Sequence, residues 1–141
     1  MKEKAVRKGS SAKAILLALL INAVGLSTVF VGSIILYSIY LSSLGVNDYV
    51  NETFNSIKLS SPFFLTCFVL ALIISSYAVY FCAKTSVERA YRDVSILSIA
   101  CVFLGFILTG HVIIVILHVL AVVLGVRSWK RRLLKASVFV Q

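Results

Sequence analysis

The sequence predicts an all-α integral membrane protein, an antiparallel four-helix transmembrane bundle with both termini cytoplasmic. Its composition is the first observation behind this prediction. The 141 residues are 60% apolar and only 13% charged, and the mean hydropathy is +1.03. A soluble domain carries roughly 45–50% apolar and about 25% charged residues. One small core could not bury so much apolar surface, so the composition excludes a water-soluble globular domain.

The distribution of charge along the chain is the second observation. Residues 14–47, 59–83 and 94–126 contain no Asp, Glu, Lys or Arg. Thirteen of the 14 basic residues lie outside these stretches on the N-terminal tail, between the second and third stretches, and after the third. Cytoplasmic loops collect Lys and Arg, so we expect all three basic segments on the inner side of the membrane. The net charge of +9 is then explained by juxtamembrane anchors, and we expect no nucleic-acid partner.

The first two apolar stretches each predict one crossing. Residues 62–83 have the roughly 20 residues that a helix needs to span the hydrocarbon core, and Pro62 suits a helix N-terminus. Residues 14–41 form a longer helix, with Tyr37 and Tyr40 at the outer boundary. Tilt absorbs its excess length. A signal peptide is the competing interpretation, but the apolar run far exceeds the usual 7–15 residues.

The third stretch, 94–126, predicts a hairpin of two short helices. Only an even number of crossings returns the basic C-terminal segment to the inner side. Gly110 offers a position for the reversal, although glycine is also common within membrane helices. The alternative is a single long helix and three crossings, with the C-terminal cations outside. The predicted segments, in order, are 1–13 basic tail, 14–41 first helix, 42–61 outer loop, 62–83 second helix, 84–93 cytoplasmic loop, 94–108 third helix, 109–111 turn, 112–129 fourth helix and 130–141 basic tail.

Small residues predict how the four helices pack. Apolar burial does not drive association inside lipid, whereas close backbone approach and polar contacts do. Each predicted helix carries a stripe of small or polar residues at intervals of three, four or seven. These stripes are Ala18, Gly25 and Gly32; Cys67, Ala71, Ser75, Ala78 and Cys82; Ser98, Cys101, Gly105 and Thr109; and His118, Ala121 and Gly125.

The predicted spans contain no Asp or Glu. Proton-coupled pumps use an intramembrane carboxylate, so this absence argues against a self-contained proton antiporter. We identify no catalytic residue, no metal ligand set and no cofactor requirement, and we expect no enzyme activity. Glu88 lies four residues before Arg92 in the loop, a spacing that predicts a helix-supporting ion pair.

His118 is the best single candidate for a cofactor-binding residue, because ionisable groups within membranes are seldom idle. His111 lies seven residues earlier, on the same face if the fourth helix includes it. Haem ligation would normally require a second histidine on a facing helix, and the chain has only these two. The simpler interpretation places His111 at the wet outer turn and gives His118 a hydrogen bond within the bundle.

Other polar residues have ordinary interpretations. Asn22 predicts an interhelical hydrogen bond, with a substrate contact as the alternative. The three cysteines have no C-x-x-C spacing, so we expect small core residues rather than thiol-redox chemistry. Asn51 begins a glycosylation sequon in the outer loop, a match that is common by chance. The 130–141 tail combines cations with apolar residues and could lie along the inner leaflet.

These observations favour a multi-pass protein of the cell membrane that acts as a non-enzymatic accessory, stabilising or assembly subunit. Its expected partners are other membrane subunits or further copies of itself, together with anionic lipids of the inner leaflet. Two alternatives remain open. One is a homo-oligomeric, holin-like pore, and the other is a small transporter or haem- or quinone-associated subunit that uses His118.

Overall fold

The structure, a computed structural model, describes residues 11–45, 62–109 and 112–138. These residues form α1 (Ser11–Ser43), α3 (Pro62–Ser86), the short 3₁₀ helix η1 (Val87–Arg89), α4 (Ala90–Thr109) and α5 (Ile113–Val138). All four α-helices are long and apolar enough to cross a membrane. The described part of the chain is therefore all-helical, and the 94–126 stretch is divided between two helices.

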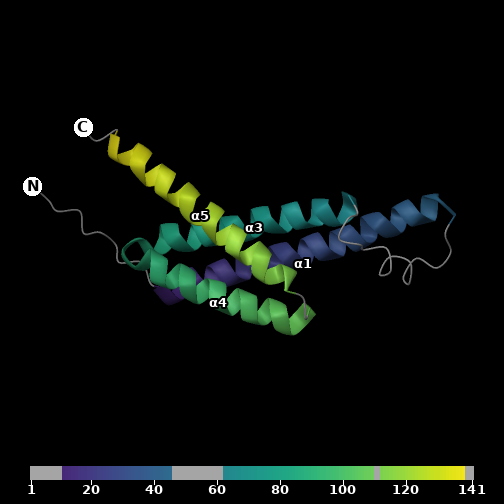
Figure 1. Cartoon of the computed structure of the whole chain (residues 1–141), viewed down its shortest axis with the longest axis horizontal. Coiled ribbons are helices and arrows are strands. Elements are labelled where there is room, and N and C mark those ends of the chain that lie inside the picture. Colours follow the sequence, from purple (N-terminus) through teal and green to yellow (C-terminus); the bar gives the residue numbers. More distant parts are fainter. Residues whose placement is uncertain (1–10, 46–61, 110–111, 139–141) are drawn as a thin grey trace, which may run out of the picture.

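The helix boundaries in the second half of the chain differ from those expected, most of all at the start of α4 and at the end of α5. α4 begins at Ala90 rather than at residue 94, because η1 links it to α3 with almost no loop. α5 continues to Val138 rather than ending at residue 129. Figure 1 shows α5 as one continuous helix, and its last turns follow the same axis as the rest. Its 26 residues have a length of about 39 Å, more than one hydrocarbon core.

α1 is also longer than expected, since it includes residues 11–13 and 42–43. It ends in a short turn in which the Leu44 and Gly45 amides donate to the carbonyl oxygens of Leu41 and Ser42 at 3.0 and 3.1 Å. Gly45 has a φ of +77°, a left-handed conformation that glycine adopts without strain and that commonly terminates helices.

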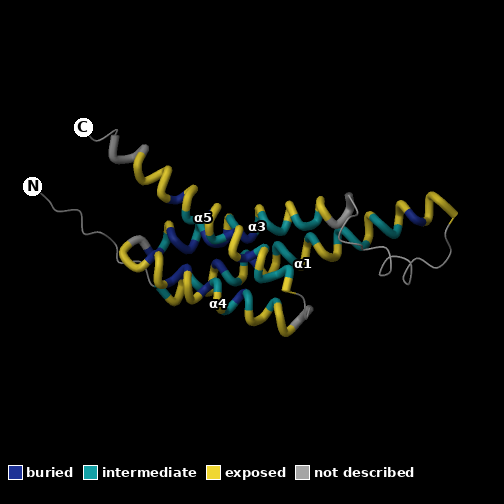
Figure 2. The backbone as a smooth tube through the Cα atoms, in the orientation of Figure 1, coloured by how far each residue is buried: buried dark blue, intermediate teal, exposed yellow. Residues whose placement is uncertain are grey.

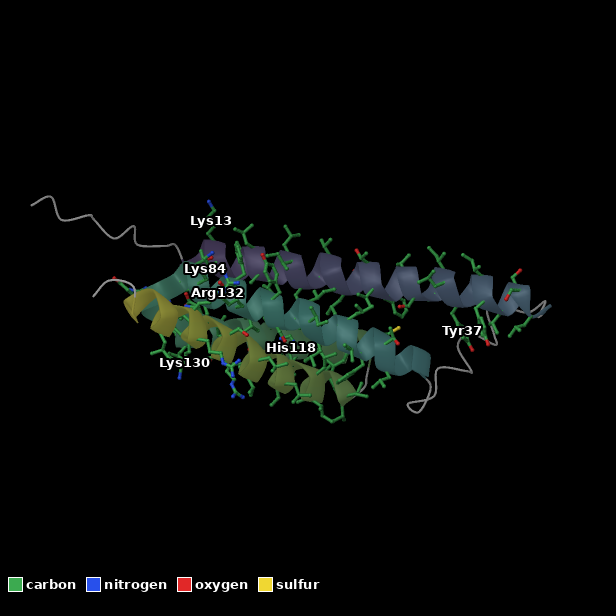
Figure 3. The ribbon with its side chains drawn as sticks, turned by 90° about the horizontal axis from the view of Figure 1, so that it is seen from above. Lys13, Tyr37, Lys84, His118, Lys130 and Arg132 are labelled. Carbon is green, nitrogen blue, oxygen red and sulfur yellow. The ribbon has the colours of Figure 1, made fainter. Side chains whose placement is uncertain are left out.

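α3 is the central helix of the bundle. It packs against α1, α4 and α5, and α4 also contacts α1 and α5. Seen from above, α3 lies between α1 and α5 (Figure 3). α3 and α5 approach each other closely at Gly125 of α5, where an added Cβ would lie 2.7 Å from the Ser76 carbonyl oxygen and from Cγ1 of Val79. Glycine is therefore needed here for backbone contact between α3 and α5.

Basic side chains gather at one end of the bundle, which we call the basic end. The start of α1, the connection from α3 to α4 and the last turns of α5 all lie toward this end, with the last turns of α5 pointing away from the other two (Figure 1). Lys13, Lys84, Lys130 and Arg132 lie at this end in Figure 3, whereas Tyr37 lies at the opposite end.

The buried core is confined to the half of the bundle near the basic end. Its members include Ala18, Val79, Leu97 and Trp129, and Figure 2 shows the buried segments concentrated there. In the opposite half, which we call the open half, Leu41 near the end of α1 is the one described side chain that is buried, with 5% of its surface exposed. The open half comprises residues 23–41, 65–74, 102–107 and 112–117.

Candidate functional site

Three helices meet at a hydrogen-bonded polar cluster inside the core. Asn22 of α1 donates from Nδ2 to Sγ of Cys101 on α4 at 3.2 Å, and its Oδ1 accepts from Oγ of Ser75 on α3 at 2.9 Å. All three side chains are buried. The interhelical bond predicted for Asn22 is present, and the amide uses both of its polar ends in holding α1, α3 and α4 together.

The cysteines behave as small core residues. Cys82 and Cys101 are buried and Cys67 is half-buried, and all three are free thiols. Sγ of Cys67 lies 2.9 Å from Oγ of Ser33 on α1, within hydrogen-bond distance. This contact connects α1 to α3 a second time, in the open half.

Asp93 corrects the expectation of a span without acidic residues. Because α4 begins at Ala90, Asp93 lies in its first turn, and the side chain is fully buried. Arg92 binds its Oδ1 from Nε and Nη2 at 3.1 and 3.0 Å, and Nη2 also donates to Oγ of Ser11 at 3.2 Å. Oδ2 is buried without a hydrogen-bond partner among the described residues. A carboxylate in a first helical turn is favoured by the helix dipole.

The expected ion pair between Glu88 and Arg92 is wrong, because Arg92 pairs with Asp93 instead. Glu88 lies in η1, and the chain between the two residues is not one continuous α-helix. The i,i+4 geometry that the prediction assumed is therefore lost.

His118 is buried as expected, with 3% of its surface exposed. The expected hydrogen bond is not found at Nε2, which is buried and has no partner among the described residues. α5 begins at Ile113. His111, expected on the same face, lies outside the described residues. The sequon at Asn51 also lies outside the described residues.

The predicted small-residue stripes face the bundle interior at most positions. Ala18, Ser75, Ala78, Cys82 and Ala121 are all 1% exposed or less. Gly32 is the exception, because an added Cβ there would meet nothing within 4 Å. The stripe on α1 therefore packs at Ala18 and at Gly25, where an added Cβ would lie 2.5 Å from Cγ2 of Ile74, whereas its last member, Gly32, faces open space.

An elongated groove lies between α4 and α5. Its deeper part, about 660 Å³, is apolar and includes Phe103, Phe106 and His118. Its other part, about 560 Å³, reaches the basic end and includes Tyr91 and Arg131. Val94, Ser95, Val122 and Val123 line both parts, so the groove is continuous.

Aromatic and cationic side chains fix the ends of α4 and α5 around this groove. The rings of Tyr91 and Trp129 meet edge to face at 5.9 Å, and Nζ of Lys130 lies 5.3 Å from the centre of the Tyr91 ring. On the other side of α5, the guanidinium of Arg132 lies 5.2 Å from the centre of the Tyr80 ring on α3. Cation–π contacts of this kind add stability and hold each cation in place.

The described residues offer two kinds of chemistry: hydrogen bonding among buried polar groups and an amphipathic groove with cations at one end. Within residues 11–45, 62–109 and 112–138, no three His, Cys, Asp or Glu side chains are grouped so that they could hold a metal ion. No family model, curated protein or solved structure matches this chain.

Proposed function

We propose that this chain is a non-enzymatic accessory, stabilising or assembly subunit of a complex in the cell membrane. In this proposal the four helices cross the membrane in antiparallel succession, with the basic end and both termini in the cytoplasm. The gathering of Lys13, Lys84, Lys130 and Arg132 at one end supports this orientation, because cytoplasmic segments are rich in Lys and Arg.

One observation carries the proposal of a partner: Leu41 is the one buried side chain among the described residues of the open half. Large apolar residues such as Phe30, Ile35 and Phe106 are at least half exposed there. Small membrane bundles gain stability from helix–helix packing, and in this half it is limited to local contacts such as the one between Gly25 and Ile74. A neighbouring membrane subunit would supply the missing packing.

The interior polar groups support a structural role over a catalytic one. Asn22, Ser75 and Cys101 bond to one another, and the carboxylate of Asp93 is bound by Arg92. None of these groups lines either part of the groove between α4 and α5. Because the stripes face inward instead of outward, the pore alternative has no comparable support.

Site-specific photo-crosslinking tests the proposed partner. A photoreactive residue replaces Phe30 in the open half or Leu16 in the half near the basic end. The two positions are matched, since both lie on α1 and are 59% and 66% exposed. We expect Phe30 to give one defined protein adduct, which also co-migrates with the chain in mild detergent. Leu16 should give mainly lipid adducts.

Three outcomes distinguish the alternatives. An adduct with a different membrane protein supports the accessory role. An adduct with a second copy of the chain indicates the homo-oligomer. If neither position gives a protein adduct and the chain runs only as a monomer, the proposal of a partner is wrong.

His118 supports a second candidate, a lipophilic cofactor such as a quinone. Nε2 of His118 is buried without a partner among the described residues, and the side chain lines the apolar part of the groove beside Phe103 and Phe106. A buried imidazole can offer a hydrogen bond to a quinone carbonyl oxygen. Extraction of the purified protein and ultraviolet spectra would reveal a bound quinone, which His118→Leu should lose. Identical extracts from both proteins would remove this candidate.

A further inference from the structure

The part of the groove between its cations and His118 has about the length of one membrane leaflet. From Lys130 to His118 it follows twelve residues of α5, which is about 18 Å of helix. One leaflet contributes about 15 Å of hydrocarbon, half of the core thickness. A single acyl chain could therefore lie along this part of the groove, and Leu134 lines the groove beyond the cations.

The walls of the groove change from apolar to cationic toward the basic end. Val94, Val122 and Val123 form the aliphatic middle. Arg127, Lys130 and Arg131 follow on α5 and line only the part at the basic end. Their spacing of three and four residues places them on one helical face. No Asp or Glu lines either part.

The cations of this face are available to an anion. Arg127, Lys130 and Arg131 are exposed, and none forms an ion pair with another described residue. Lys130 is positioned by the Tyr91 ring, a contact that leaves its ammonium free to bind an anion as well. Arg132, by contrast, points to the other side of α5 and contacts Tyr80 of α3.

We propose that this groove is a binding site for one acidic phospholipid of the inner leaflet, with its phosphate held by Arg127, Lys130 and Arg131 and one acyl chain between α4 and α5. Basic pockets between helices at the cytoplasmic side recognise acidic headgroups, and guanidinium groups bind phosphate oxygens in a bidentate manner. Two features of the lipid therefore match the groove. The negative phosphate matches the cations at one end, and the acyl chain matches the apolar walls.

The proposal rests on the membrane-embedded bundle with its basic end in the cytoplasm, and it does not require a protein partner. A zwitterionic lipid would satisfy the apolar part of the groove but would not match three cations. A soluble phosphate compound would satisfy the cations but would leave the aliphatic part without an occupant. Both can be tested as competitors.

Trp129 provides a direct readout, since it is the only tryptophan in the chain. It packs against Tyr91, which lines the groove. The full chain is placed in nanodiscs of phosphatidylcholine that contain increasing fractions of phosphatidylglycerol with brominated acyl chains, and quenching of Trp129 is measured. We expect saturable quenching by brominated phosphatidylglycerol, and only weak, linear quenching by brominated phosphatidylcholine.

The variant Arg127→Gln/Arg131→Gln should raise the half-saturating fraction of phosphatidylglycerol by roughly tenfold or more, since each cation near an anionic headgroup contributes measurably. The matched control Lys84→Gln/Arg89→Gln removes the same charge from exposed positions that do not line the groove. The half-saturating fraction of phosphatidylglycerol for this control should stay within about twofold of the parent value. Charges away from the site are screened by salt and have little effect on binding there.

A third variant tests the acyl-chain part separately. Ser95→Phe fills the point where the two parts of the groove meet, and it should abolish saturation, whereas Ser95→Ala should retain it. Circular dichroism checks that each variant remains helical. If a variant fails to fold, high salt applied to the parent chain tests the same charge dependence.

The proposal is overturned if both lipids quench the parent chain equally, or if the two double variants weaken binding alike. It is also overturned if soluble glycerol phosphate displaces the quencher at millimolar concentration, because the site would then bind free anions. A failed crosslink from Phe30 would count against the proposed subunit function and would leave this result unaffected.

Discussion

The side-chain amide of Asn22 on α1 donates a hydrogen bond to Sγ of Cys101 on α4 across 3.2 Å, although the two residues lie 79 positions apart in the sequence. The same side chain accepts a bond from Ser75. One amide therefore connects three of the four helices in the half of the bundle near the basic end. Because lipid provides no water to replace them, these bonds help to define which faces of the helices meet.

Replacing Asn22 with Leu should destabilise the bundle by about 1–2 kcal/mol. The substitution nearly conserves volume, but it removes both interhelical bonds, which contribute roughly 0.6–1.7 kcal/mol each in membrane proteins. Thr28→Val is the control, since the Thr28 hydroxyl is exposed and bonds only to the Val24 carbonyl of its own helix. Unfolding by denaturant in mixed micelles measures the difference. Equal stability of Asn22→Leu and the parent chain would contradict this role.

Gly125 and Gly32 should respond in opposite ways to alanine. The added methyl group at position 125 meets the backbone oxygen of Ser76 and the side chain of Val79, both 2.7 Å away, so α3 and α5 must separate. We expect a loss of about 1–3 kcal/mol, the usual effect of overpacking. At Gly32 the methyl group meets nothing, so stability should stay the same or rise by up to about 1 kcal/mol. Equivalent losses at the two sites would contradict the described packing.

Arg92→Gln should destabilise the protein more than Arg92→Gln combined with Asp93→Asn. The single variant leaves the fully buried carboxylate of Asp93 without its cation, and an unsatisfied buried group costs at least about 1 kcal/mol. The double variant removes the charge that needs compensation, so part of the loss should be recovered. Thermal unfolding in detergent compares them. A double variant that is less stable than the single one would show that the carboxylate does not depend on Arg92.

His118→Leu should leave the bundle as stable as before, or stabilise it by about 1 kcal/mol. The buried Nε2 has no partner among the described residues, and burying such a polar group has an energetic cost that leucine avoids. Urea or heat unfolding of the delipidated protein gives the comparison. A clear loss of stability would indicate that the imidazole makes a bond that holds the bundle together.

The sequence was sufficient to predict the class of fold and much of the packing. Charge placement predicted that the 94–126 stretch would divide, and residue size predicted the inward positions of Ser75, Ala78 and Ala121. These predictions succeed because the bilayer imposes the same requirements on length, charge and small residues in every helical membrane protein.

The remaining features depend on how the helices meet. The lack of charge in residues 94–126 predicts Asp93 in a loop, because nothing local indicates that α4 begins at Ala90 or that Arg92 bonds both Asp93 and Ser11 of α1. The sequence does not predict that α5 continues beyond Trp129 to Val138. A basic segment without regular structure and a basic continuation of a helix can have the same composition, so composition does not distinguish them. The groove between α4 and α5 depends on the angle between two helices, which no pattern of residues in either helix reveals.

The most direct test of the whole account is the side of the membrane on which the basic end lies. The chain with all three cysteines replaced by alanine receives a single cysteine by Ser128→Cys at the basic end or Ser43→Cys at the opposite end, both at exposed positions. Intact cells are then treated with a membrane-impermeant thiol reagent. We expect labelling of Ser43→Cys in intact cells, and labelling of Ser128→Cys only after the membrane is permeabilised. Labelling of Ser128→Cys in intact cells would contradict the orientation, and with it the inner-leaflet lipid site and the antiparallel bundle.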